Sequence, residues 1–225
     1  MFSRFSRFRG LVVRSIARSN ILSQSPIAVF ILLLTIATSL IAWQYADLFR
    51  LFVLHPFSLV RERKYYTLLT SGLIHADVGH LFFNMFSFYF FALGKYGLER
   101  AAGSWRFLII YLASLILSDI STVLKHRDDP AYFCLGASGA VTAVIFSFII
   151  YEPNAKIGLM FIPIPVPAPI FGILYVAYSY YSARYRQTRV NHAAHLWGAI
   201  SGLALTLVLD PPAFSRFLHV LNLAA

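Results

Sequence analysis

Two short motifs give this chain a serine and a histidine that could act together in nucleophilic catalysis. Ser138 lies in Gly136-Ala137-Ser138-Gly139, at the start of a long apolar run that ends at Tyr151. His195 lies in Ala194-His195-Leu196-Trp197-Gly198, at the start of another apolar segment. A serine hydroxyl becomes an effective nucleophile when a neighbouring base takes its proton, and histidine is the side chain that most often does so. The pair therefore indicates acyl-transfer chemistry if the two segments pack together.

Small residues accompany both motifs and would let their segments pack closely. Gly198 and Gly202 follow His195 by three and seven positions, so all three lie on one stripe of a helix. Gly139 follows Ser138 directly, and glycines on facing helices let two backbones approach each other. If these faces meet, the His195 ring would come within about 3 Å of the Ser138 hydroxyl. Taken singly, either motif is also explained by small-residue packing without catalysis.

A further polar pair lies in the apolar segment that begins at His80. Asn84 follows His80 by four positions, which puts both side chains on one face of a helix. Both side chains can donate hydrogen bonds to an oxyanion that develops in a transition state. A polar pair of this kind can equally hold two membrane helices together, so both interpretations stay open on this motif alone.

The composition predicts that most of the protein surface contacts lipid. Of the 225 residues, 59% are hydrophobic and 12% are charged, whereas soluble domains carry about 25% charged residues. The net charge of +10 does not indicate nucleic acid, because the Lys and Arg residues are scattered between the apolar runs, as is typical of helix ends at a membrane surface. The single cysteine, Cys134, excludes an internal disulfide and multi-cysteine metal sites, and we expect it to have a packing role.

Six apolar segments predict an all-α integral membrane protein with a six-transmembrane-helix bundle in residues 26–210. A helix needs about 20 apolar residues to cross a bilayer, or fewer when other helices surround it. A basic arm, residues 1–25, precedes the bundle, and a short C-terminal tail, residues 211–225, follows it. The predicted spans are Pro26–Tyr45, His80–Tyr96, Trp105–Val123, Gly136–Tyr151, Pro169–Ala183 and Asn191–Leu209.

The basic arm has a second interpretation. It holds five arginines, several serines and no acidic residue, and an organellar presequence has the same composition. We favour a cytoplasmic arm because the segment is short and runs directly into the first apolar span. From the compact loops and the lack of an obvious seventh helix, the chain is expected in a bacterial inner membrane, with the mitochondrial inner membrane as the alternative.

Two connections between the predicted spans have unusual patterns. Residues 46–79 form a long amphipathic connection. Further along, proline occupies every second position from Pro163 to Pro169. Because proline lacks an amide hydrogen and clashes with the preceding helical turn, Phe161–Ala168 is predicted to be extended, which leaves a short fifth helix.

Taken together, the motifs resemble the rhomboid family of intramembrane serine proteases. The family pattern has a histidine and an asparagine four apart on helix two, GxSG opening helix four and AHxxGxxxG on helix six. In this chain these are His80 and Asn84, residues 136–139 and residues 194–202. The resemblance covers about residues 47–210, including Leu68–His75 before helix two and Leu98-Glu99 after it.

The resemblance implies a rhomboid-like six-helix bundle with a semi-embedded first loop, acting as an endopeptidase on transmembrane segments of membrane proteins. Ser138 would be the nucleophile and His195 the general base and acid of a dyad. His75, His80, His192 and His195, with Asn84, would line a polar pocket that holds water. Beyond the lipid bilayer and its protein substrates, no metal, cofactor or nucleic acid is implied. The implied oxyanion and substrate-binding positions are His80, Asn84, Gly136 and the Ser138 amide, and the helix-packing positions are Gly139, Gly198 and Gly202.

The chain departs from the family pattern at two places. Tyr66-Thr67 stands where many relatives carry Trp-Arg, which removes an arginine that could anchor the first loop. Thr142 stands one turn after Ser138, where the best-studied relatives have a tyrosine that stacks under the catalytic histidine. Support for His195 must therefore come from elsewhere in this chain.

The sequence fits three other functions less well than the protease. An inactive rhomboid-like protein would bind membrane segments without cutting them, but such proteins lack the serine or the histidine, and both are present here. A zinc protease of the membrane typically shows HExxH on a helix, which is absent. A transporter would place paired charges or broken helices at the bilayer midplane, and Asp119 is the one plausible embedded acid, expected near a helix end.

Overall fold

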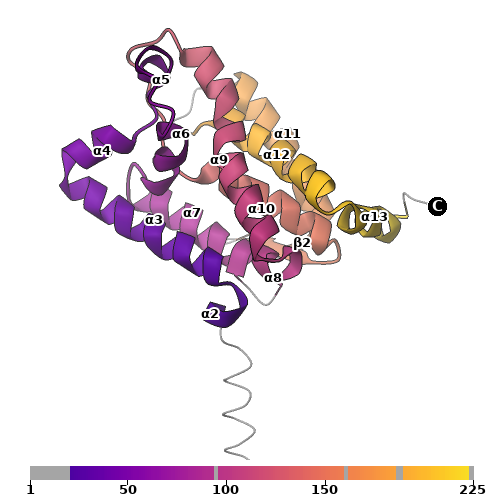
Figure 1. Ribbon diagram of the computed structural model, residues 1–225. Coiled ribbons are helices and arrows are strands. Elements are labelled where there is room, and N and C mark those ends of the chain that lie inside the picture. The colour runs from indigo at the N-terminus through magenta and orange to yellow at the C-terminus, as the bar shows by residue number, and fades with distance from the viewer. Residues whose placement is uncertain (1–20, 94–95, 160–161, 186–189, 223–225) are drawn as a thin grey trace, which may run out of the picture.

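The computed structural model describes residues 21–93, 96–159, 162–185 and 190–222, and most of them are helical (Figure 1). Of the predicted basic arm, residues 1–20 lie outside the described residues, and a single helical turn, α2 (Ile21–Gln24), follows them. Each of the six predicted spans contains a helix. These are α3 (Pro26–Gln44), α7 (Val78–Phe88), α9 (Ser104–His126), α10 (Ser138–Tyr151), α11 (Ala168–Tyr185) and α12 (His192–Leu209).

Shorter helices form the connections and the C-terminal tail. The long connection between α3 and α7 holds α4 (Ala46–Phe52), α5 (Pro56–Glu62), α6 (Thr67–Thr70) and the 3-10 turn η1 (Ser71–Leu73). Helix α7 continues into a π-helical turn, η2 (Tyr89–Leu93), and α8 (Leu98–Ala102) precedes α9. The predicted tail contains a further helix, α13 (Pro211–Val220).

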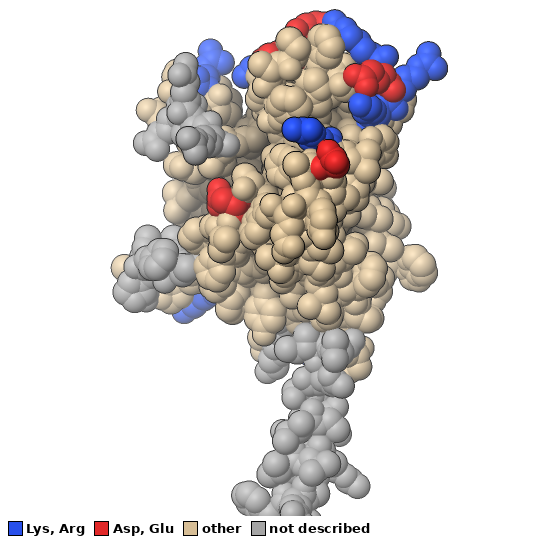
Figure 2. Space-filling view, turned by 90° about the vertical axis from the view of Figure 1, so that its left-hand side faces the viewer, with Lys and Arg blue, Asp and Glu red and all other residues tan. Residues whose placement is uncertain are grey.

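The surface and the helix lengths are those of an integral membrane protein. Among the described residues, α3, α9 and α12 are long and apolar enough to cross a membrane, and α10 is a shorter apolar helix. Large apolar side chains are exposed on several helices, such as Phe30 on α3 and Ile173 on α11. In Figure 2 one face is free of charged residues over most of its height, and most of the charged side chains in view gather toward the end where α5 lies. Six crossings of the membrane and an embedded first loop stay predictions.

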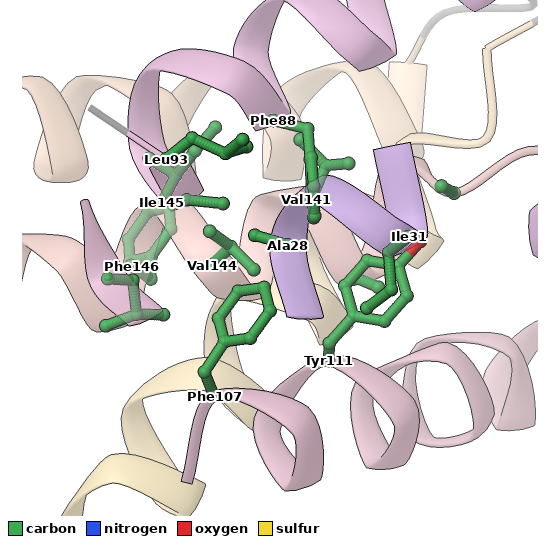
Figure 3. Close-up of a cluster of buried hydrophobic side chains, with 14 of the residues drawn as sticks. Ala28, Ile31, Phe88, Leu93, Phe107, Tyr111, Val141, Val144, Ile145 and Phe146 are labelled. Carbon is green, nitrogen blue, oxygen red and sulfur yellow. The ribbon is translucent and has the colours of Figure 1, made fainter. Parts of the chain in front are cut away.

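Helix α10 lies at the centre of the bundle, and its neighbours cover it on all sides. Every residue from Gly139 to Ile150 is buried. Figure 3 shows Val144 of α10 among side chains of α3, α7 and α9, including Ala28, Phe88 and Phe107. Because α10 has no polar face, its position is determined by the shape of its neighbours and not by amphipathicity.

Two paired β-strands lie between α10 and α11, so the prediction of an all-α fold is wrong at this place. Strand β1 (Lys156–Leu159) pairs antiparallel with β2 (Ile162–Pro167), and Ile157 lies opposite Val166. Extended backbone was predicted for Phe161–Ala168, and β2 confirms it for Ile162–Pro167. Phe161 lies outside the described residues, and Ala168 is instead the first residue of helix α11. The alternating prolines explain why the segment pairs with one strand alone, because a proline cannot donate a ladder hydrogen bond.

The backbones of α10 and α12 touch where α12 has glycine. A Cβ on Gly198 would collide with the carbonyl oxygen of Gly139, and a Cβ on Gly202 would lie 2.8 Å from the Cα of Ala143. Hydroxyl groups then connect the helices: Ser147 of α10 donates to the carbonyl of Gly202 at 3.1 Å. Glycine and small hydroxyl residues are the usual means by which helices associate in a membrane.

A buried carboxylate fixes the beginning of α3. Glu99 of α8 is 1% exposed, and its oxygens accept hydrogen bonds from the amides of Ile27 and Ala28 at 3.2 and 2.7 Å. Ser104 donates a third at 2.6 Å. The free amides at a helix start attract negative charge, so this single side chain joins α3 to the α8–α9 corner.

The contact at Gly202 yields a stability prediction. Gly202→Ala would gain about 1 kcal/mol of helix propensity, but the added methyl meets the α10 backbone at Ala143, which cannot rotate away. We expect a net loss of about 1–2 kcal/mol in the free energy of unfolding in detergent.

Gly172→Ala on α11 is the matched control. Its added methyl would meet only the ends of the Ile149 and Phe146 side chains, at 3.2 and 3.5 Å. These can yield, so this variant should be as stable as the wild type or slightly more so. Equal stability of the two variants would contradict the packing argument.

Candidate active site

Three helices that carry predicted site residues begin with local signals in the sequence. Asp77 caps α7 by accepting a hydrogen bond from the amide of His80 at 2.8 Å. Asn191 caps α12 in the same way through the amide of Ala194 at 3.1 Å. Helix α10 begins at Ser138, after Gly136 has turned the chain with a φ of 109°. His80, Ser138 and His195 therefore all lie in the first turns of their helices.

Ser138 and His195 lie on touching turns of α10 and α12. A Cβ on Gly139 would be 3.4 Å from the carbonyl oxygen of Ala194, so the residues next to both side chains are in contact. Both side chains are half-buried and border one cavity. No hydrogen bond joins Ser138 to His195 in the described part of the chain.

This cavity has a volume of about 770 Å³ and is lined mainly by apolar and aromatic side chains. Asn84, Ser138 and His195 are among its polar residues, together with Ser87, Thr142 and Tyr175. The aromatic wall comes from α7, η2, α10 and α11, and Lys156, Ile157 and Gly158 of β1 also line the cavity. Its apolar lining residues include Phe83, Phe86, Phe90, Phe91, Phe148, Ile157 and Phe171.

His80 and Gly136 lie beside the cavity, in contact with each other. A Cβ on Gly136 would be 2.7 Å from Nε2 of His80, so the ring packs directly on the glycine. Nδ1 of His80 accepts a hydrogen bond from the amide of Ala76 at 3.5 Å, and a neutral ring with Nδ1 as acceptor carries its hydrogen on Nε2. Nε2 therefore lies next to the loop that precedes Ser138.

Asn84 is held by the same helix that carries His80. Its side-chain nitrogen donates to the carbonyl oxygen of His80 at 3.0 Å. This bond uses one of the two N–H groups of the amide. Within the described residues the second N–H group has no partner, and Asn84 lines the cavity.

His75 has a different place from the one predicted. It was expected to line a polar pocket with His80 and His192. His75 is fully buried, and none of these three residues lines the cavity. Its Nδ1 lies 3.1 Å from the hydroxyl of Ser39 on α3, and its Nε2 accepts from the amide of Ala137 at 3.4 Å. His75 therefore holds the residue before Ser138 in place.

Two further backbone contacts fix the loop before α10. Leu54 and Cys134 exchange amide–carbonyl hydrogen bonds of 3.1 and 2.9 Å, and the amide of Gly136 donates to the carbonyl of Ser71 at 2.9 Å. Burial raises the pKa of the Cys134 thiol, and the charge of Asp119 adds to this effect. The thiol stays neutral near pH 7, in agreement with a packing role.

The sequence did not predict that β1 and Tyr175 line the cavity, nor that His75 contacts the loop before Ser138. Ser87 and Phe91 follow Asn84 by three and seven positions, so helical spacing alone could have placed them on its face. Tyr175 had a weaker signal: it follows the buried Gly172 by three positions on α11. The contact of His75 with Ala137 joins distant segments, and no local pattern indicates it.

Comparison with known proteins places residues 62–211 in the family described as Rhomboid domain. The chain is 30% identical over 154 residues to RHOMBOID-like protein 12, mitochondrial, of Arabidopsis thaliana, covering 62% of this chain and 45% of that protein. It is 30% identical over 151 residues to the Bacillus subtilis (strain 168) rhomboid protein YdcA, covering 66% and 69%. It is 26% identical over 161 residues to Rhomboid protease GluP of the same bacterium, covering 71% and 29%. The chain thus spans less than half of the first and third relatives.

The contact between Gly136 and His80 predicts a large cost for a side chain at position 136. Gly136→Ala would put an L-residue at a φ of 109° and press its methyl against the His80 ring. We expect a loss of about 3 kcal/mol in the free energy of unfolding, the sum of backbone strain and overpacking.

Gly103→Ala separates the two effects, because Gly103 has a φ of 86° and open space around it. This control should show the strain alone, about 1–2 kcal/mol. Unfolding in detergent would measure both variants, and equal losses would mean that His80 does not press on Gly136.

Proposed function

The chain belongs to the rhomboid family, and from this we propose that it is an intramembrane serine endopeptidase that cleaves transmembrane segments. Ser138 is the nucleophile and His195 the general base and acid. One observation carries the proposal: both side chains border a single cavity from the touching turns of α10 and α12. The relatives include bacterial and mitochondrial proteins, and we favour a bacterial inner membrane.

In the proposed reaction, Ser138 Oγ attacks the carbonyl carbon of the scissile peptide while His195 accepts its proton. His195 then gives that proton to the leaving amine, and a water molecule hydrolyses the acyl-enzyme by the same route. Within the described residues no hydrogen bond joins Ser138 to His195. Catalytic hydrogen bonds are often loose without substrate and tighten when it binds.

Three groups support the oxyanion that this attack creates. The amide of Ser138 is one of the first amides of α10, which lack partners within the helix. Nε2–H of His80 approaches the same loop at Gly136, and Asn84 keeps one N–H group for the cavity. Preorganised donors of this kind stabilise the transition state more than the substrate.

The length of α10 supports a site below the membrane surface. Helix α10 has 14 residues, which extend about 21 Å, whereas the hydrocarbon core is about 30 Å thick. At its end the Tyr151 hydroxyl donates to Asp210 at 2.9 Å, and the guanidinium of Arg106 lies 4.0 Å from the same carboxylate. We assign this charged cluster to one membrane surface, which puts Ser138 roughly 10 Å inside the opposite one.

The cavity supports an extended apolar segment as substrate. A transmembrane helix hides its carbonyl groups in its own hydrogen bonds, so it must unwind before Ser138 can reach one. Small or helix-breaking residues near the cleavage site would make unwinding easier. The aromatic lining between α7 and α11 would then receive the apolar side chains of the unwound segment.

The second candidate function is binding without cleavage. A rhomboid-like protein that only holds membrane segments needs the cavity but neither Ser138 nor His195. The presence of both residues on touching turns favours the protease.

Labelling with a fluorophosphonate probe tests the nucleophile directly. The wild type in detergent or liposomes should form a covalent adduct, because His195 activates Ser138 for attack on phosphorus. Ser138→Ala and His195→Ala should abolish labelling and the cleavage of a transmembrane test substrate without changing the melting temperature. Strong chelators should leave both activities intact.

Ser215→Ala, which changes an exposed serine on α13, should be labelled like the wild type. Cleavage that persists in Ser138→Ala would contradict the proposed serine mechanism. A wild type that binds the segment but is neither labelled nor active would support the binding protein instead.

The oxyanion assignment predicts effects on turnover more than on binding. His80→Ala and Asn84→Ala should each lower kcat by about 10²–10³ with little change in KM, the loss typical of one oxyanion donor. Initial rates measured in liposomes over a range of substrate-to-lipid ratios separate the two constants.

His219→Ala on α13 is the matched control, since His219 is exposed, and it should leave kcat unchanged. If His80→Ala and Asn84→Ala raised KM alone, the two residues would be substrate contacts and not oxyanion donors.

A further inference from the structure

We propose that Tyr175 of α11 is the residue that positions His195 for catalysis, acting together with Thr142 of α10. The inference rests on the proposed Ser138–His195 dyad. Tyr175 would supply the aromatic support for His195 that Thr142, one turn after the nucleophile, cannot provide.

The Tyr175 ring is stacked with an offset on the His195 ring. Their centroids are 6.3 Å apart and the planes are inclined by 27°. His192 approaches the same imidazole edge-on, with centroids 5.9 Å apart and planes at 81°. The His195 side chain makes no hydrogen bond within the described residues, so these two rings are the aromatic neighbours that orient it there.

The Tyr175 ring is itself fixed by aromatic side chains. Phe146 of α10 packs against it with centroids 5.7 Å apart, and Phe171, one turn earlier on α11, lies at 5.8 Å. Tyr175 is half-buried and borders the cavity. A ring held on several sides loses little further freedom when it supports another ring.

A chain of hydrogen bonds links the phenol to the nucleophile. Thr142 Oγ1 donates to the carbonyl oxygen of Ser138 at 2.8 Å, and lies 3.0 Å from the hydroxyl of Tyr175. Because a threonine hydroxyl has one hydrogen, Thr142 must accept the bond that Tyr175 donates. The nucleophile's own backbone is thus connected through Thr142 and Tyr175 to the ring of the base.

This bridge aligns the dyad before substrate arrives. Ser138 and His195 do not bond directly, so their relative placement depends on the helix packing and on these two side chains. Helix α11 packs by a narrow face, with buried residues at Ala168, Gly172, Ser179 and Ser182, while Ile173 and Leu174 are exposed. His195 is therefore supported only while α11 is docked against α10 and α12.

Two substitutions separate the ring from the hydroxyl, and a third is their control. Tyr175→Leu removes both and should lower kcat by about 10²-fold, the effect of displacing a catalytic group by about 1 Å, while KM stays within about twofold. Tyr175→Phe keeps the ring and loses one neutral hydrogen bond, so its loss should be less than about tenfold. Tyr180→Leu, an exposed tyrosine of the same helix, should match the wild type.

The measurements are kcat and KM for a transmembrane test substrate in liposomes, and the rate of fluorophosphonate labelling of Ser138. Labelling of the wild type and its loss in Ser138→Ala decide the proposed function first. If the wild type is labelled, labelling of Tyr175→Leu should be slowed in step with kcat. A wild-type kcat in Tyr175→Leu, or a change confined to KM, would overturn the positioning role.

Two further comparisons complete the test. Equal losses in Tyr175→Phe and Tyr175→Leu would overturn the role of the ring. If Tyr175→Leu does not fold, Thr142→Val decides, since it is nearly isosteric and frees the phenol. It should lower kcat by about tenfold or less, and an unchanged kcat would overturn the bridge.

Discussion

The close contact between α10 and α12 is the constraint on which the rest of the structure depends. In lipid, hydrophobic burial gives helices little reason to associate, because the lipid tails are as apolar as the side chains. Association relies there on van der Waals contact and interhelical hydrogen bonds, and both need short distances between backbones. Gly198 and Gly202 provide that distance, and the hydroxyls of Thr206 and Ser147 then bond across the two helices at 2.9 Å. The adjacency of the two candidate catalytic side chains is a consequence of this packing.

The start of α10 needs support from outside the helix, because the first amides of a helix have no partners in its own hydrogen-bond ladder. That support comes from the connection between α3 and α7. His75 accepts a hydrogen bond from the amide of Ala137. The carbonyl of Ser71 accepts one from the amide of Gly136, and the backbone of Leu54 pairs with that of Cys134. The long connection between α3 and α7 thus supports the loop that precedes the proposed nucleophile, through its hydrogen bonds to residues 134–137.

Helical spacing made part of this arrangement predictable. The stripe from His195 to Gly202 and the pair His80 and Asn84 could be read from the sequence, because their partners recur every three or four positions. The prolines likewise predicted extended backbone, since their effect is local. The pairing of β1 with β2 and the contact of His75 with Ala137 could not be predicted, because each joins segments whose distance in space depends on the whole fold.

The pairing of Thr142 with Tyr175 is a further feature that local sequence patterns could not predict. An imidazole ring needs an aromatic neighbour on one face, and that face is bordered by α10 and α11, so either helix can supply it. Thr142 is 2% exposed, and a large ring there would compete with Tyr175 for the same volume. A small residue on α10 and a tyrosine on α11 are therefore a matched pair, and the threonine hydroxyl makes the match specific by accepting the phenol hydrogen. Sequence patterns within one helix miss such a pair, because the two residues lie on different helices and the role of each depends on contact with the other.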